Sequence, residues 1–290
     1  MQRSSLVLVT DPTGRAAVPF HTADASAPQL SVFDSAVTRG DGVFETVAIF
    51  DGRVSGLDAH LGRFARSAAL LDLPAPSPET WRSACAAALD AMEPVPEATL
   101  RLVLTRGTGD GVPSAWVVAA ASADHTIART EGVRVSLLNR GIPRESPADA
   151  RWLLAGAKTL SYAVNAAAQR EAARRGADDA IFVSSDGYVL EGPTSSVVYR
   201  VGNRFGTPET GATLAGTTQF AVFTWARRQG FETGTDLITP DQLRGVDAAW
   251  LVSSGRLAAP IREIDGQAHP VDTTVTPAVN AWLRRGDGPE

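Results

Sequence analysis

Among the residue types that can do chemistry, one stands out because the chain has a single lysine, Lys158. The sequence has 27 basic residues, and all the others are arginines. Lysine is common in ordinary domains, so this composition indicates that arginine is used wherever any positive charge serves. Arginine does not lose its proton in a protein, whereas a desolvated lysine can act as a base or form a Schiff base. Two interpretations stay open: a chance surface lysine, or one retained for chemistry.

Glu191 is a second candidate, in the segment DGYVLEGPTSSVVY. A carboxylate at a strand end, beside a turn rich in hydroxyl groups, could hold a protonated ring nitrogen. The turn itself could bind an anion through its backbone N–H groups. The alternative is a polar exit from a hairpin.

Three further segments suit a phosphate group. In LAGTTQFAVF a Gly-Thr-Thr step enters a helix, whose N-terminus offers N–H groups and a positive dipole. Ser254 lies in a similar hydroxyl-bearing turn, and Arg63 lies near His60 on an amphipathic helix. The alternatives are an ordinary threonine cap and a solvated helix arginine.

The elements that must position these residues alternate between strands and helices. Apolar patterns predict strands at 5–10, 42–50, 98–104, 115–121, 133–138, 197–200 and 248–252, and a hairpin at 181–190. Helical spacing and capping signals predict helices at 57–71, 78–92, 161–175, 217–229 and 276–285. We therefore expect a mixed α/β (α+β) fold of two domains: a smaller one at 1–122, a connector at 123–130, and a larger one at 131–290 that carries the lysine.

Composition excludes several classes of protein. A net charge of −5 argues against general nucleic-acid binding. The lone Cys85 excludes an internal disulfide, and the four histidines lack the spacing of a metal site. No apolar run approaches the ~18 residues of a membrane span, and the N-terminus reads as a first strand rather than a signal peptide. We expect a cytoplasmic protein that binds neither metal, nucleic acid nor membrane.

Taken in order, the motifs resemble the fold-type IV pyridoxal-phosphate enzymes, the class IV aminotransferase family. The matching segments are DSAVTRGDGVFET, DAHLGRFARSA, LVLTRG, the Lys158 segment AGAKTLSYAVNAAA, GADDAIFVSSDGYVLEGPTSSV, LAGTTQ and WLVSSGRLAAPIREIDG. Each motif is weak alone, but the ordered set is specific and covers nearly the whole chain. The resemblance implies a two-domain fold, pyridoxal 5′-phosphate as cofactor and a homodimer.

The resemblance also implies roles for residues. Lys158 would form the Schiff base with the cofactor and move a proton, and Glu191 would hold the pyridine nitrogen protonated. The phosphate and turn contacts would come from Arg63, Ser195, Thr217, Thr218 and Ser254. Relatives often place a tyrosine five residues after the lysine. Here that position is Ala163 and Tyr162 comes one earlier, so its contact with the cofactor stays open.

The specific reaction is less constrained. The sequence is most similar to those of 4-amino-4-deoxychorismate lyases, which form 4-aminobenzoate and pyruvate on the path to folate. Arg39 and Arg106 would then bind substrate carboxylates, and Thr46 would be a general acid near the ether oxygen. Two alternatives are kept: an aminotransferase acting on D-amino acids (or branched-chain ones) at the same site, and a relative that only binds or regulates.

Overall fold

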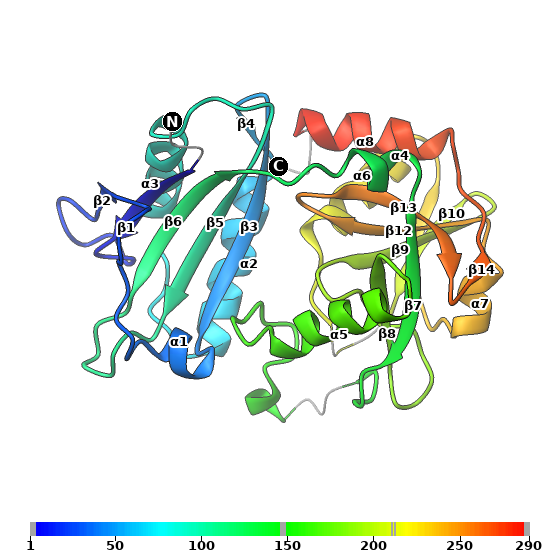
Figure 1. Ribbon diagram of the computed structural model, residues 1–290, viewed down its shortest axis with the longest axis horizontal. Coiled ribbons are helices and arrows are strands. Elements are labelled where there is room, and N and C mark those ends of the chain that lie inside the picture. The colour runs from blue at the N-terminus through cyan, green and yellow to red at the C-terminus, as the bar shows by residue number, and fades with distance from the viewer. Residues whose placement is uncertain (1–3, 146–148, 210, 212, 287–290) are drawn as a thin grey trace. The chain divides into compact units, whose positions relative to one another are not determined.

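A computed structural model describes residues 4–145, 149–209, 211 and 213–286 (Figure 1). The chain divides into two compact units. Unit 1 holds residues 1–123 together with 157–162, and unit 2 holds 124–156 together with 163–289. Helices and strands are both substantial, which confirms the mixed α/β class. None of the helices in the described ranges combines the length and the apolar character needed to cross a membrane.

Unit 1 is built on a six-stranded antiparallel sheet, in the order β2-β1-β6-β5-β3-β4. Its strands are β1 (Ser4–Val9), β2 (Phe20–Ala23), β3 (Gly42–Phe50), β4 (Arg53–Val54), β5 (Glu97–Thr105) and β6 (Ala115–Ala121). Its helices are α1 (Ser35–Arg39), α2 (Leu57–Leu70) and α3 (Pro78–Asp90).

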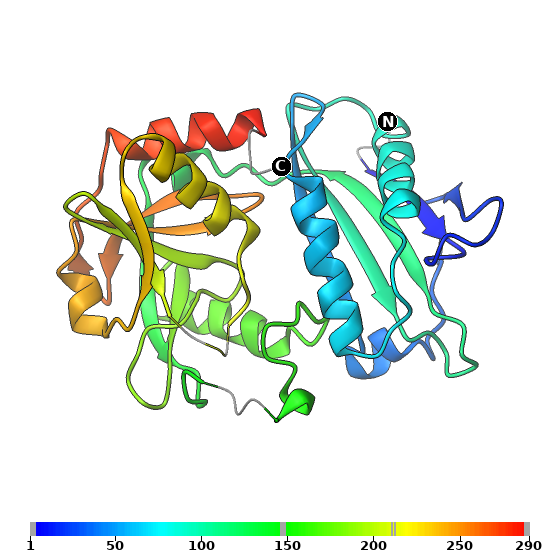
Figure 2. The same ribbon diagram turned by 180° about the vertical axis from the view of Figure 1, so that it is seen from behind.

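Helices α2 and α3 cover one face of this sheet. They lie behind the strands in Figure 1 and in front of them in Figure 2. The apolar stripe of α2 includes Leu61 and Phe64, and Phe64 meets Trp81 of α3 edge-on at 4.8 Å. Helix α3 begins as its sequence predicts, because the Ser77 side chain accepts from the Thr80 N–H and Pro78 occupies the first helical turn. These elements confirm the strand and helices expected at 42–50, 57–71 and 78–92.

The segment that carries Lys158 belongs to unit 1. Val43 of β3 forms an antiparallel bridge with Thr159. The Phe44 N–H donates to the Lys158 carbonyl at 3.1 Å, and the Leu160 N–H donates to the Gly42 carbonyl at 2.8 Å. The segment therefore extends the sheet of unit 1 at the start of β3.

Unit 2 is built on an eight-stranded mixed sheet, in the order β11-β10-β9-β12-β13-β7-β8, with β14 paired to β13. Its strands are β7 (Val133–Asn139), β8 (Asp179–Val183), β9 (Ser196–Val201), β10 (Arg204–Pro208), β11 (Glu232–Asp236), β12 (Ala248–Ser253), β13 (Leu257–Ile264) and β14 (Gln267–Ala268). Its helices are α4 (Thr126–Thr130), the 3₁₀ turn η1 (Arg151–Leu153), α5 (Ala163–Arg174), α6 (Thr217–Arg228), α7 (Pro240–Arg244) and α8 (Val275–Arg285).

The boundaries of the two units differ from the expected domains in two respects. Residues 124–130, expected as a connector, lie in unit 2 and include the short helix α4. Lys158, expected in the second domain, lies in unit 1 because its backbone pairs with β3. Sequence order alone assigns Lys158 to the second domain, because the stretches of chain before and after residues 157–162 belong to unit 2.

Candidate active site

The amine of Lys158 is held by two aromatic residues of unit 1. Its Nζ donates to the Tyr162 hydroxyl at 3.2 Å and lies 4.3 Å from the centre of the Phe44 ring. The two rings meet edge-on at 5.0 Å, so each fixes the other. A cation over an aromatic face is attracted by the ring quadrupole. Lys158 is half-buried and oriented, rather than a mobile surface lysine.

Arg63 lies in a buried ionic cluster with Glu45 and His60. Glu45 is on β3 and is fully buried, while His60 and Arg63 come from α2 and are nearly so. Arg63 Nε donates to one carboxylate oxygen at 2.6 Å and Nη2 to the other at 2.8 Å. His60 Nδ1 lies 2.7 Å from the second oxygen.

The electrostatics of this cluster depend on the balance between burial and pairing. Burial alone would raise the pKa of Glu45, but hydrogen bonds and charge from Arg63 and His60 outweigh it and lower that pKa to about 2. The Glu45 carboxylate is therefore ionised throughout the physiological range of pH. Both of its oxygens contact side chains of α2.

Ser67 connects the cluster to the lysine segment. Its hydroxyl accepts from the Lys158 N–H at 3.1 Å, and it is buried on α2 one turn after Arg63. Residues four apart share one helix face. The structure thus places the turn of α2 that follows Arg63 beside the backbone of Lys158.

The expected substrate residues of unit 1 lie in different environments. Arg106 donates from Nε to Asp41 at 2.8 Å and from Nη2 to the Leu71 carbonyl at 2.6 Å. The hydrogen bond to Asp41 raises the pKa of Arg106, so the guanidinium is charged and already paired. Arg39 ends α1 and is exposed, and its side chain forms no hydrogen bond or ion pair within the described ranges.

Thr46 lies on the same face of β3 as Phe44, because side chains two apart on a strand point the same way. Arg101 of β5 stands opposite Thr46 in the antiparallel pairing, and its guanidinium carbon lies 5.5 Å from the centre of the Phe44 ring. Thr46 is therefore near the aromatic pair that holds the lysine amine, and Arg101 adds a second cation to that face.

In unit 2, Glu191 is held by a tight turn. Its carbonyl accepts from the Phe182 N–H of β8, and the Gly192 N–H donates to the Ser195 carbonyl, both at 2.8 Å. Its carboxylate accepts from the Leu214 N–H at 3.3 Å. The Ser195 hydroxyl is buried against Gly192, with no hydrogen-bond partner among the described residues.

Three predicted segments of unit 2 converge on Ser196, the first residue of β9. It directly follows the Glu191 turn. It also pairs with Val252 of β12, two residues before Ser254. Gly216 packs so closely on it that a Cβ atom there would collide with the Ser196 hydroxyl. Gly216 is the N-cap of α6, and no side-chain hydrogen bond caps that helix start, where Thr217 and Thr218 follow.

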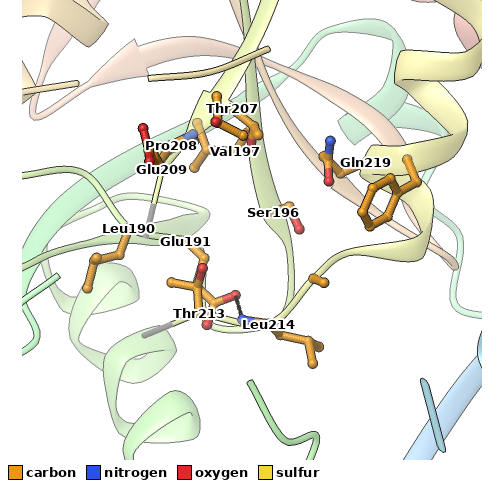
Figure 3. A pocket seen from close by; sticks show the side chains of 13 residues that line it. Leu190, Glu191, Ser196, Val197, Thr207, Pro208, Glu209, Thr213, Leu214 and Gln219 are labelled. Carbon is orange, nitrogen blue, oxygen red and sulfur yellow. Dashed lines mark hydrogen bonds between the residues drawn. The ribbon is translucent and has the colours of Figure 1, made fainter. Parts of the chain in front are cut away.

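The Glu191 turn and the first part of α6 border a cavity of about 240 Å³, whereas Thr217, Thr218 and Ser254 do not line it. Figure 3 shows this cavity with Glu191 and Leu214 on one side and Gln219 on another. Its lining is Leu190, Glu191, Ser196, Val197, Thr207, Pro208, Glu209, Thr213, Leu214, Ala215, Gln219, Phe220 and Thr235. Ser196 lines the cavity, whereas the expected Ser195 does not. Two carboxylates, Glu191 and Glu209, therefore line one cavity of unit 2 together with hydroxyl groups and the Gln219 amide.

Each unit by itself has groups that fit part of pyridoxal phosphate. In unit 1, the Lys158 amine can bond an aldehyde carbon. In unit 2, the Glu191 carboxylate can hold a protonated ring nitrogen, and the start of α6 offers N–H groups to a phosphate. The sequence analysis missed Phe44, Glu45, His60 and Arg101 as members of the site. A signal for Glu45 existed, because a carboxylate inside the apolar strand GVFETVAIF requires a buried partner.

Comparison with known proteins identifies the family of the chain. The family model for class IV amino-transferases matches residues 42–264. A Mycobacterium tuberculosis protein named bifunctional aminodeoxychorismate lyase / D-amino acid transaminase is 43% identical over 255 residues, which are 84% of this chain and 88% of that protein. A fold IV-transaminase structure from Curtobacterium pusillum is 48% identical, with a TM-score of 0.93 and 99% of each chain covered.

A second solved structure connects the fold to its cofactor. It is a hypothetical aminotransferase from Mycobacterium tuberculosis in its PLP-bound form, 37% identical, with a TM-score of 0.88 and 98% of each chain covered. The lysine, the carboxylate and the helix start are thus found in a chain whose family depends on pyridoxal phosphate. This protein belongs to the class IV aminotransferase family of pyridoxal-phosphate enzymes.

Proposed function

We propose that the protein is a 4-amino-4-deoxychorismate lyase that forms 4-aminobenzoate and pyruvate. The observation that carries the proposal is the oriented Lys158 amine, held by Tyr162 and Phe44. It is supported by the 43%-identical relative, whose name gives this lyase as one of two activities. The reaction needs no second substrate, because loss of the enolpyruvyl group leaves an aromatic ring and releases pyruvate.

Bound pyridoxal phosphate supplies a sink for the electrons that remain when a proton leaves the carbon bearing the substrate amine. Lys158 removes that proton with its amine and holds the cofactor between turnovers. Glu191 keeps a proton on the pyridine nitrogen through its carboxylate. Thr46, on the face of β3 that bears Phe44, donates a proton to the departing ether oxygen.

Other residues of the chain bind the phosphate. Arg63 contributes a guanidinium that Glu45 already orients. In unit 2, Thr217 and Thr218 at the start of α6 and Ser254 after β12 offer hydroxyl and N–H donors. The turn that holds Ser254 is fixed by Arg129 of α4, which donates to the Gly255 carbonyl at 2.7 Å.

The substrate has two carboxylates, and unit 1 offers Arg39 and Arg106 to bind them. Arg39 is exposed, so it binds a carboxylate without breaking a protein contact. Arg106 uses one edge of its guanidinium for Asp41, so a carboxylate adds to that pair or displaces it.

Transamination of D-amino acids is the second candidate, favoured by the other activity in the name of the same relative. The purified protein should be incubated with 4-amino-4-deoxychorismate alone and, separately, with D-alanine plus 2-oxoglutarate. Formation of 4-aminobenzoate without an amino acceptor supports the lyase. Transfer of the amine to 2-oxoglutarate, with no 4-aminobenzoate in the first incubation, rejects it in favour of the aminotransferase.

The proposal includes a cytoplasmic homodimer acting on small molecules. Large apolar side chains around α1 support the dimer, since Val32, Phe33 and Val37 are all more than half exposed. Light scattering at working concentration tests it. A monomer with full activity contradicts it.

A further inference from the structure

We infer that Glu45, assisted by His60, is a positioning residue that orients Arg63 for the cofactor's phosphate group. The inference rests on the proposed phosphate role of Arg63 and extends it to two residues that carry no assigned role. The observation is the buried Glu45 carboxylate, whose two oxygens both contact side chains of α2. One edge of the Arg63 guanidinium donates to both oxygens, and His60 Nδ1 lies beside one of them.

The geometry fixes the direction of the guanidinium plane. Glu45 occupies the Nε and Nη2 edge, with donor–acceptor distances of 2.6 and 2.8 Å. A two-point contact between planar groups removes rotation about the end of the side chain. Arg63 therefore meets its ligand pre-oriented, which lowers the entropic cost of binding.

His60 completes the support of the carboxylate. It lies three residues before Arg63 on α2, so both reach β3 from one helix face. Its Nδ1 is 2.7 Å from the Glu45 oxygen that also accepts from Arg63 Nη2. With His60 in place, Glu45 cannot swing away from the helix. The three side chains act as one unit.

Two effects of Glu45 on phosphate binding oppose each other. Its negative charge repels a phosphate, while its hydrogen bonds orient the arginine that attracts one. Orientation dominates, because a buried arginine that loses its carboxylate partner is left with unpaired donors and moves toward water. Removing the charge should therefore weaken phosphate binding rather than strengthen it.

The test compares affinities of the cofactor-free protein for pyridoxal 5′-phosphate and for pyridoxal, by titration of the visible absorption band. The two ligands differ only in the phosphate, so their affinity ratio isolates that contact. The variants are Glu45→Gln, which keeps the shape, and Glu45→Asp, which keeps the charge. Glu171→Gln is the matched control, since Glu171 also pairs with arginines but its side chain on α5 is 34% exposed.

We expect Glu45→Gln to reduce the ratio by about tenfold or more, the scale of one charge-assisted hydrogen bond. Pyridoxal affinity should stay within about twofold, Glu45→Asp should recover part of the ratio, and Glu171→Gln should leave it unchanged. An unchanged ratio, a higher one, or equal losses for both ligands overturns the inference. If Glu45→Gln does not fold, His60→Gln replaces it, and a ratio equal to wild type then has the same meaning.

The affinities of the wild-type protein distinguish a failure of this inference from a failure of the proposed function. A wild-type ratio near one removes the phosphate role of Arg63 itself, and absence of any pyridoxal-phosphate band rejects the proposed enzyme. A large wild-type ratio that Glu45→Gln leaves unchanged overturns only the positioning role of Glu45.

Discussion

The buried Glu45 makes the stability of the protein sensitive to acid in a defined range of pH. Its pKa falls from an ordinary 4.5 to about 2 in the folded chain. A lowered folded pKa contributes stability above the unfolded pKa, and that contribution is lost as the pH falls from 4.5 toward 2. A difference of 2.5 pH units corresponds to about 3 kcal/mol of unfolding free energy at neutral pH.

The loss with pH follows from the same two pKa values. Linkage gives a loss that is small at pH 5, about 1 kcal/mol at pH 4 and about 2 kcal/mol at pH 3. Glu45→Gln cannot titrate, and its stability should not show this component.

The measurement is urea unfolding of cofactor-free wild type and Glu45→Gln at pH 5, 4 and 3, followed by tryptophan fluorescence. The other carboxylates titrate alike in both proteins and cancel in the difference. The stability advantage of wild type should shrink by about 2 kcal/mol between pH 5 and pH 3. A constant advantage would show that the pKa of Glu45 is not lowered and that its pairing with Arg63 is weaker than the geometry indicates.

Four further predictions concern the site. Lys158→Arg should lose turnover and the borohydride-sensitive visible band as completely as Lys158→Ala, because a guanidinium cannot replace the amine; normal turnover would reject the assignment. Tyr162→Phe should keep the band but shift the pH at which it changes, since Nζ loses its partner at 3.2 Å; an identical pH profile contradicts that contact. Glu191→Gln should retain the cofactor and slow turnover by about 3 kcal/mol; an unaltered kcat refutes its role. Arg106→Gln should lower kcat/KM by about 1.5–3 kcal/mol without affecting cofactor affinity, whereas Asp41→Asn, which leaves the arginine intact, should retain most of kcat/KM; loss of cofactor from Arg106→Gln would place that residue at the phosphate instead.

Local signals predicted the elements that hold the site. The strand at 42–50 and the helix after Ser77 follow from an apolar run and a capping residue, which act over a few residues. Strand β13 went unpredicted because Pro260 interrupts LAAPIREI, and proline is disfavoured inside sheets. The fold tolerates it there because pairing with the parallel neighbour β7 begins only at Ile261.

Long-range pairing was beyond the reach of sequence patterns. Lys158 and Glu191 were selected by residue type and family resemblance, but nothing local shows that the lysine segment pairs with β3. Likewise, Arg106 and Asp41 lie 65 positions apart, and only the fold shows that they form an ion pair. Arg63 was selected from its helix position and the family resemblance, whereas its carboxylate partner depends on how α2 packs on the sheet.

The discontinuity of unit 1 has a consequence for how the protein is made. During synthesis, residues 1–123 emerge first, but the edge of β3 at Gly42–Phe44 stays unpaired until 157–162 follow. Unpaired strand edges are sites of aggregation. A fragment that ends at 123 would therefore keep an exposed edge and lack the lysine. Neither unit can be exchanged between relatives by a single crossover. Residues 157–162, which carry Lys158, belong to unit 1 but lie between the two sequence segments of unit 2.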